Sequence, residues 1–166
     1  MASSISGKSR VAIVGFCTTS RDLAPWSDPA VEIWGLNKGY IFMPRPQLDT
    51  YQLGDRWFET HSEAIYGWEM RRPHKHQEWL AAFPGPVYQH VVDPAIPNSV
   101  ALPLEALARE TGGLLHRLAV TPEGRAGALR SCEREPYLTS TIAYELALAI
   151  MERFEEYGVS EFFLTL

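Results

Sequence analysis

An uninterrupted apolar segment near the N-terminus constrains the fold of this chain more than any other feature. Residues 10–17 have the sequence Arg-Val-Ala-Ile-Val-Gly-Phe-Cys, in which β-branched side chains dominate the centre. A run of this kind, with no polar side chain after its first residue, is typical of a strand that is buried on both faces, as in a parallel sheet. The segment therefore predicts a central strand of an α/β domain.

The rest of the chain alternates between segments typical of strands and segments typical of helices. Further strands are expected over residues 31–37, 55–61, 87–92 and 160–166, helices over 76–83, 104–110 and 137–157, and a loop over 93–102. Gly158 is expected to end the last helix. This alternation predicts β-α-β units, and so a Rossmann-like three-layer α/β domain with a mostly parallel sheet of about five strands.

The length of 166 residues suits one domain. Residues 1–9 are small and polar, which predicts a disordered tail, and residues 10–166 are expected to form the single domain. The chain ends at a predicted strand. Either that strand completes the sheet, or the chain is truncated at its C-terminus and is a fragment of a longer protein.

Charge and cysteine content narrow the classes of partner. The net charge is −5 and the basic residues are scattered, which argues against a nucleic-acid groove. Cys17 and Cys132 do not make a disulfide framework. We find neither a signal peptide nor an apolar stretch of the roughly 18 residues that span a bilayer. These features predict a cytoplasmic protein without a membrane partner, and leave a monomer and a homo-oligomer both open.

Polar residues follow several predicted strands, at the edge where open parallel sheets bind their ligands. Hydroxyls, an amide, an imidazole and a helix N-terminus together suit a ligand that carries phosphate. Ordinary turn and helix-cap chemistry is the alternative for each of them. The candidates are Gly15, Thr18, Thr19, Ser20, Asn37, Lys38, Glu59, His61, Ser62, Tyr137, Thr139, Ser140 and Thr141.

Among the ionisable groups, His61 is the candidate general acid or base, because an unperturbed imidazole titrates near neutral pH. A structural role is its alternative. His74 and His76 lack an obvious third ligand, so no metal site is predicted. The glycine motifs of dinucleotide and P-loop sites are missing from the sequence, so no cofactor is specified.

Glu145 lies within an apolar part of the last predicted helix. Helical spacing places it on one face with Thr141 and Glu152. This pattern is typical of a solvated polar face. The alternative is a functional carboxylate near the ligand.

Four segments of the chain resemble a group of uncharacterised phage and prophage proteins. These segments are Val-Ala-Ile-Val-Gly-Phe-Cys-Thr-Thr-Ser, Ile-Trp-Gly-Leu-Asn-Lys-Gly-Tyr, Asp-Arg-Trp-Phe-Glu-Thr-His and Tyr-Leu-Thr-Ser-Thr-Ile-Ala-Tyr-Glu-Leu-Ala-Leu-Ala-Ile. That group is distantly similar to the motility-associated-factor and bacterial sialyltransferase-like Rossmannoids. The resemblance implies a site for a nucleotide-linked donor, in the host cytoplasm if the protein is encoded by a phage. The matching positions are Gly15, Ser20, Asn37, Tyr40, Ser140 and Thr141.

We therefore expect a protein that binds a nucleotide or nucleotide-sugar, with transferase chemistry that uses His61. Thr18, Thr19 and Ser20 would hold phosphate, Asn37 would contact base or sugar, and Ser140 and Thr141 would hold a second anionic group.

Two other functions stay open. Residues 139–145 are similar to the helix start of nucleoside deoxyribosyltransferases, which implies Glu145 as a nucleophile. A non-catalytic phage interaction or assembly protein with the same fold is the third reading.

Overall fold

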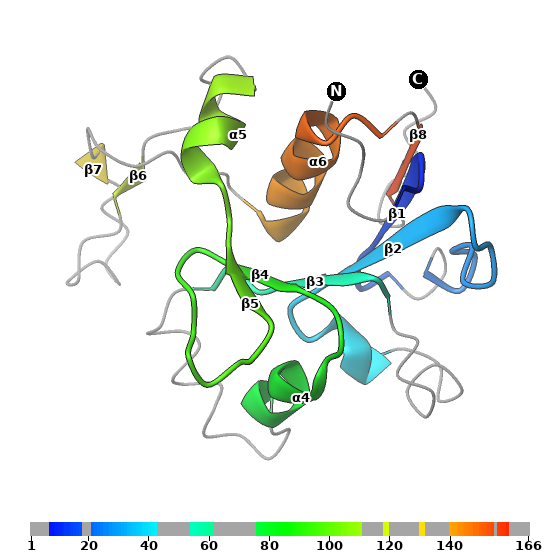
Figure 1. Cartoon of the computed structure of the whole chain (residues 1–166), viewed down its shortest axis with the longest axis horizontal. Helices are drawn as coiled ribbons and strands as arrows, with labels where there is room; N and C mark the ends of the chain where they lie inside the picture. Colours follow the sequence, from blue (N-terminus) through cyan, green and yellow to red (C-terminus); the bar gives the residue numbers. More distant parts are fainter. Residues whose placement is uncertain are drawn as a thin grey trace.

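The computed structural model of the chain describes residues 7–17, 21–42, 54–61, 76–110, 118–119, 130–131, 140–154 and 156–159. Within these residues, one sheet carries the fold (Figure 1). Its strands are β1 (Arg10–Val14), β2 (Val31–Leu36), β3 (Arg56–Phe58), β4 (Val87–Gln89), β5 (Ser99–Ala101) and β8 (Glu156–Val159).

The six strands lie in the order β5-β4-β3-β2-β1-β8, and every neighbouring pair is parallel. The predicted α/β fold with a parallel sheet is confirmed. Strands β2 to β5 extend from one side of β1, and β8 lies on the other side. This reversal of direction makes the carboxyl end of β1 a switch point of the kind beside which open α/β sheets bind their ligands.

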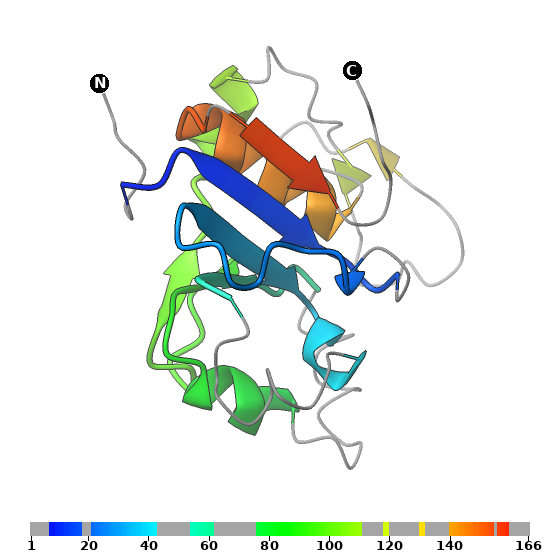
Figure 2. The same ribbon diagram turned by 90° about the vertical axis from the view of Figure 1, so that its right-hand side faces the viewer.

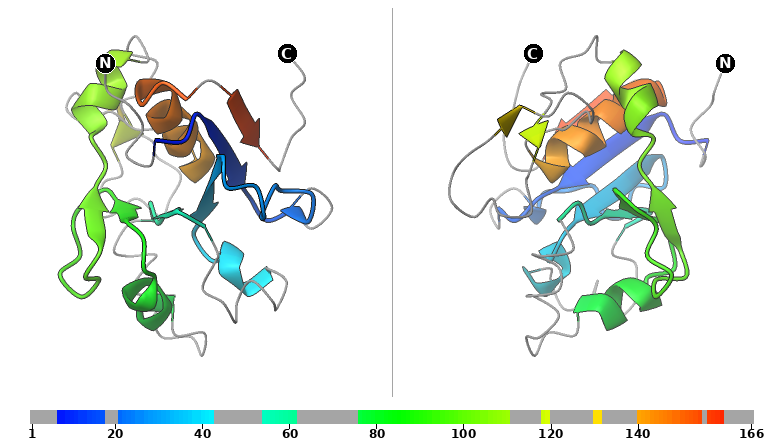
Figure 3. Two further views of the ribbon diagram at one scale, coloured as in Figure 1. Left: turned by 45° about the vertical axis from the view of Figure 1, so that its right-hand side comes forward. Right: turned by 90° about the vertical axis from the view of Figure 1, so that its left-hand side faces the viewer.

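Helices cover both faces of the sheet. Helices α5 (Leu104–Glu110) and α6 (Thr141–Met151) lie on one face, whereas α4 (His76–Ala82) and the 3-10 helix η1 (Gly39–Phe42) lie on the other (Figure 1, Figure 2). An antiparallel pair of two-residue strands, β6 (Leu118–Ala119) with β7 (Arg130–Ser131), forms a separate small sheet, drawn in yellow in Figure 3.

Each face of the sheet has its own apolar core, because successive side chains of a strand point to opposite faces. Val11, Ile13 and Trp34 pack toward α5 and α6, with Tyr144 and Leu148 among their neighbours. The opposite core combines aliphatic side chains with three aromatic ones, of which Trp57 has no exposed surface. Its members are Ala12, Val14, Val31, Ile33, Tyr40, Trp57, Leu80, Phe83, Val87 and Ile96.

Several predicted strands are shorter than expected. The first ends at Val14 rather than residue 17, and Phe16 and Cys17 are exposed. β3 covers the centre of the predicted segment 55–61, and β4 ends at Gln89 rather than residue 92. The prediction ran past Gln89 because Val91 is apolar, but the side chain of Val91 is 77% exposed and lies outside the buried strand.

The predicted loop over residues 93–102 is wrong at β5, which pairs with β4 at the edge of the sheet. Three partly exposed residues between prolines give no apolar pattern in the sequence. At the other end of the chain, Lys8 donates hydrogen bonds to the Val31 carbonyl oxygen at 3.2 Å and to Asp55 Oδ1 at 2.9 Å. Lys8 therefore contacts the first residue of β2 and the residue before β3.

The last helix ends earlier than predicted. α6 stops at Met151, Glu152 is its C-cap, and Arg153 takes a positive φ of 61°. Gly158, expected to end the helix, instead lies in β8 opposite Ala12 of β1. Residues 137–139 of the predicted helix and the predicted strand 160–166 lie outside the described residues.

The solvated face predicted on this helix is also wrong. Thr141 and Glu145 are buried, and Glu152 is largely covered. The reason is that this side of α6 packs onto the sheet. There Thr141, at the start of the helix, bonds to Asn37, and Glu152, at its end, bonds to Arg56.

Candidate functional site

The carboxyl ends of the strands bring several predicted site residues together. Asn37 directly follows β2, and Thr60 and His61 lie just beyond β3. Ser140 is the N-cap of α6, where its side chain accepts a hydrogen bond from the backbone N–H of Ala143. Gly15 follows β1 and is buried. The predicted phosphate contacts at Thr18, Thr19 and Ser20 lie outside the described residues, as do Ser62, Tyr137 and Thr139.

On the α6 side of this edge, three polar side chains form a directed chain of hydrogen bonds. The Thr141 hydroxyl donates to Asn37 Oδ1 at 3.3 Å, and its oxygen lies 2.7 Å from the Thr60 hydroxyl oxygen. Because a hydroxyl has one proton, Thr141 must accept from Thr60. The start of α6 therefore lies against the ends of β2 and β3.

Backbone contacts hold Asn37 in place. Its φ is 46°, a left-handed conformation in which asparagine is one of the few common non-glycine residues. Its N–H donates to the Phe58 carbonyl at 2.7 Å, and its own carbonyl accepts from Trp57 Nε1 at 2.9 Å. Asn37 is therefore oriented by β3 before any ligand arrives.

On the α4 side of the same edge, the buried carboxylate of Glu59 lies between two imidazoles. Glu59 Oε1 is 2.5 Å from His61 Nδ1 and also accepts from the His61 backbone N–H at 3.1 Å. Glu59 Oε2 is 2.7 Å from Nε2 of His76, the first residue of α4. Both oxygens of one carboxylate are thus occupied by ring nitrogens from different parts of the chain.

These contacts set the ionisation state of Glu59. Burial by itself would raise the pKa of Glu59, but the hydrogen bonds and charges of His61 and His76 outweigh it and lower that pKa from 4.5 to about 2. Glu59 is therefore a carboxylate at neutral pH. A buried carboxylate stabilises an adjacent imidazolium and orients the ring that it touches.

His61 differs from its two partners in its accessibility. Its side chain is 36% exposed, whereas Glu59 and His76 are buried. With Nδ1–H directed at Glu59, Nε2 is the nitrogen that carries the lone pair when the ring is neutral. An exposed imidazole with a carboxylate behind it is the arrangement of a general base in many hydrolases and transferases.

Sequence reasoning named Glu59 and His61 separately and missed their link to His76. The spacing of Glu59 and His61 was a usable signal, since alternate residues of an extended segment point to one face. No sequence signal connects Glu59 with His76, because the pairing depends on how α4 docks onto the sheet.

Tyr40, a predicted ligand contact, lies behind the exposed edge. It is 6% exposed, and its hydroxyl oxygen is 3.2 Å from His76 Nδ1. Its ring stacks on Trp79 of α4, with 4.0 Å between centroids and 5° between planes. In this conformation Tyr40 supports His76 and presents little surface to a ligand.

Comparison of the chain with protein-family models, curated proteins and solved structures found no match. The resemblance to phage proteins and to sialyltransferase-like Rossmannoids therefore stays a prediction. In the part of the chain that the structure describes, no helix is both long and apolar enough to cross a membrane. Nor do the described ranges contain a group of three histidine, cysteine or acidic side chains that could hold a metal ion.

Glu145, the alternative nucleophile, lies one helical turn beyond Thr141 on α6 and is 0% exposed. A nucleophilic carboxylate must contact the substrate atom that it attacks. In this conformation, access to Glu145 is closed. His61 is therefore better placed for chemistry than Glu145.

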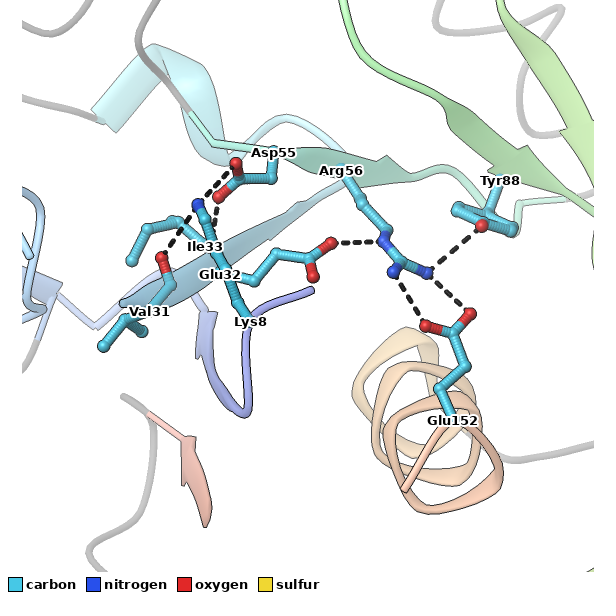
Figure 4. A network of polar contacts seen from close by, with 8 residues as sticks. All are labelled: Lys8, Val31, Glu32, Ile33, Asp55, Arg56, Tyr88 and Glu152. Atoms are coloured by element: carbon cyan, nitrogen blue, oxygen red, sulfur yellow. Dashed lines mark hydrogen bonds and ion pairs between the residues drawn. The ribbon is translucent and has the colours of Figure 1, made fainter. Parts of the chain in front are cut away.

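At the amino edge of the sheet, a second polar network joins the layers (Figure 4). Arg56 is 2% exposed and bonds to Glu32, to Glu152 through two contacts of 2.7 Å, and to the Tyr88 hydroxyl at 3.2 Å. Its guanidinium also lies over the Trp34 ring. Burial disfavours the charged form of Arg56, but the carboxylates of Glu32 and Glu152 outweigh this effect and raise the pKa of Arg56. Burial also raises the pKa of Tyr88. Because the charged groups of this network are bonded to one another, the network indicates a structural role.

A cleft of about 520 Å³ also lies at the amino edge, beside the first residues of β2 and β3. Its charged side chains are paired, Lys8 with Asp55 at 2.9 Å, and Asp28 with Arg10 at 2.6 Å. Ligands of open α/β sheets bind at the opposite edge. The polar groups around Asn37 and His61 are therefore the better candidate site.

Proposed function

We propose that this protein binds a nucleotide or nucleotide-sugar at the carboxyl edge of its sheet, and that His61 is the general base of a transfer reaction. The observation that carries the proposal is the exposed imidazole of His61, held at Nδ1 by the buried carboxylate of Glu59. The pair follows β3, which is the neighbour of β2, and β2 in turn lies next to β1 with its switch point; this position at the carboxyl edge supports a ligand site there.

The proposed reaction moves a glycosyl group from a nucleotide-linked donor to an acceptor hydroxyl. His61 Nε2 takes the acceptor proton as the acceptor oxygen forms its bond to the sugar carbon. The bond between that carbon and the donor phosphate oxygen breaks, and the nucleotide leaves with the electron pair. The proton on His61 then passes to solvent or to the released nucleotide.

Hydrogen-bond polarity supports a polar donor ligand at the same edge. Thr141 donates to the Asn37 amide oxygen, so the Asn37 amide nitrogen is the group that can donate to an acceptor on a base or sugar. The start of α6 lies beside this amide, and a helix N-terminus favours an anionic group. A ligand with both a phosphate and a polar ring would use all of these groups.

The first test is a thermal-shift screen against nucleotides, CMP- and UDP-linked sugars, and free deoxynucleosides. A ligand at 100 times its Kd should stabilise the fold by about 2.7 kcal/mol, which for a chain of this size is a shift of several degrees. We expect CMP- or UDP-type ligands to give that shift. No shift with any compound would contradict the proposal and favour an interaction protein.

A pair of histidine variants then tests the chemistry. His61→Ala should keep the ligand-induced shift and lose turnover of the donor. The matched control is His90→Ala, because His90 follows β4 at the same edge and has its ring against Tyr144. Turnover that survives in His61→Ala would remove His61 from the mechanism. A shift with deoxynucleosides, and turnover lost in Glu145→Gln instead, would favour the deoxyribosyltransferase alternative.

A further inference from the structure

Two buried arginines differ in how their guanidinium groups are bonded. Arg56 is 2% exposed, donates from Nε to Glu32, and forms a fork of two 2.7 Å bonds to both carboxylate oxygens of Glu152. Arg21 is 5% exposed, and its Nε and Nη2 donate to the same oxygen, Oδ1 of Asp22, at 3.2 Å and 3.1 Å. Its Nη1 is buried and has no hydrogen-bond partner among the residues that the structure describes. Arg21 therefore lacks the complete set of contacts that indicates a structural role for Arg56.

The bonding of Arg21 leaves capacity for a second anion. A buried charged donor without an acceptor is unfavourable, because it has lost water and gained nothing in return. Asp22 compensates only in part, since its side chain is 58% exposed and its contacts are longer than the roughly 2.8 Å of a strong charge-assisted bond. Few such groups persist in native proteins, and a ligand that supplies the acceptor is one reason for them.

Backbone contacts place Arg21 beyond the carboxyl end of β1. The strand ends at Val14, and the Arg21 N–H donates to the Cys17 carbonyl oxygen at 2.9 Å. The Arg21 carbonyl oxygen accepts from the Ala24 N–H at 3.0 Å and from Trp26 Nε1 at 3.1 Å. The main chain of Arg21 is thus held on both sides, next to the switch point beside which open α/β sheets bind their ligands.

We propose that Arg21 binds a phosphate-type anion at this end of β1, and that Asp22 occupies the guanidinium when no ligand is present. The anion enters at Nη2, because the carboxylate that lies there belongs to an exposed side chain. Two of its oxygens then accept from Nη2 and Nη1 together, in the forked geometry that Arg56 has with Glu152. The identity of the anion as the phosphate of a nucleotide rests on the proposed function, but the anion site itself does not.

The experiment is isothermal titration calorimetry of the full chain with inorganic pyrophosphate, at neutral pH and fixed ionic strength. We expect the natural protein to bind pyrophosphate, and Arg21→Gln to raise its Kd at least about tenfold, because charge-assisted hydrogen bonds are lost. The matched control is Arg109→Gln, which removes the same charge from an exposed position on α5 and should leave the Kd unchanged. No binding by the natural protein, or an equal Kd in Arg21→Gln, would overturn the proposal.

A second variant keeps Arg21 and so guards against misfolding of Arg21→Gln. Asp22→Asn removes the charge that competes with the ligand, so the Kd for pyrophosphate should fall by about two- to fivefold. The control for the change in net charge is Glu105→Gln on the exposed side of α5, which should leave the Kd unchanged. Weaker binding in Asp22→Asn, or an equal gain in Glu105→Gln, would also overturn the proposal.

Pyrophosphate is not a nucleotide, so the two proposals can fail separately. Pyrophosphate binding that depends on Arg21, without a thermal shift from any nucleotide, would leave the anion site and refute the nucleotide function. Binding of CMP- or UDP-type ligands that is unchanged in Arg21→Gln would leave the function and refute the role of Arg21 in it.

Discussion

Arg56, the first residue of β3, and Glu152, the C-cap of α6, are joined by two hydrogen bonds of 2.7 Å each (Figure 4). At the other end of the helix, Thr141 bonds to Asn37 and lies 2.7 Å from the hydroxyl oxygen of Thr60. The helix is therefore anchored antiparallel to the strands at both ends. The pair at the amino edge helps to determine where the helix begins at the carboxyl edge.

We expect Glu152→Gln to lower the free energy of unfolding by about 3 kcal/mol, because it removes one charged partner of a buried guanidinium. Glu32 remains as the other partner, which limits the loss. Urea unfolding followed by circular dichroism measures the change. The control is Glu105→Gln on the exposed side of α5, which should change stability by less than about 0.5 kcal/mol. Equal effects of the two substitutions would show that the pair adds no stability.

The stability of the fold should fall in acid partly through Glu59. Its pKa is lower in the folded protein, about 2 against 4.5, so its contribution is complete above pH 4.5 and is lost as the pH falls toward 2. The full contribution corresponds to about 3 kcal/mol. Unfolding free energies of the natural protein and of Glu59→Gln, measured from pH 6 to pH 2, give the difference. A difference that does not shrink with acid would contradict the lowered pKa.

Gly35→Ala should destabilise the protein strongly. A Cβ atom at Gly35 would lie 2.2 Å from Cζ3 of Trp57, a ring with no exposed surface. Overpacking of a core of this kind costs about 3 kcal/mol or more. The matched control is Gly39→Ala, whose Cβ would meet the same ring at 3.8 Å, an ordinary contact. Similar melting temperatures for the two variants would mean that Trp57 can move.

Substitutions at Ser140 separate its role as a helix cap from binding of an anion. Ser140→Ala should cost about 1 kcal/mol, because the backbone N–H of Ala143 loses the side-chain oxygen that caps the helix and keeps only the Ser140 carbonyl oxygen, at 3.1 Å, as its acceptor. Ser140→Asp should keep the cap and therefore the stability. If the helix start also holds a phosphate, the added carboxylate should repel it and abolish the ligand-induced thermal shift. Nucleotide binding that survives in Ser140→Asp would place the phosphate elsewhere.

The central strands were predictable because the residue types within each segment are enough to indicate a buried strand. The apolar runs around Val11 and Ile33 are typical of strands buried on both faces of a sheet. In the structure the two runs form the neighbouring strands β1 and β2. The start of α6 was predictable within a few residues, because hydroxyl side chains precede an apolar helical pattern. The carboxyl-edge rule for parallel sheets named Asn37 and Thr141 as candidates, and the structure brings their side chains together.

Other features have no local cause in the sequence. The helical pattern continues beyond Met151, but the chain turns at Arg153 so that the segment around Gly158 can pair with β1. β5 exists because β4 offers its edge to a short, partly exposed segment. In both places, hydrogen bonds to a distant strand outweigh the local preference.

The candidate site likewise combines features that are local in the sequence with features that depend on distant residues. By itself, the sequence determined the parallel sheet and the polar residues at its carboxyl edge, because apolar runs and strand ends are local properties. Only the tertiary structure decided that Glu145 is buried and that Glu59 lies between His61 and His76. The physical reason is that the partners of a buried charge are whatever groups the packed layers place beside it, at any separation along the chain.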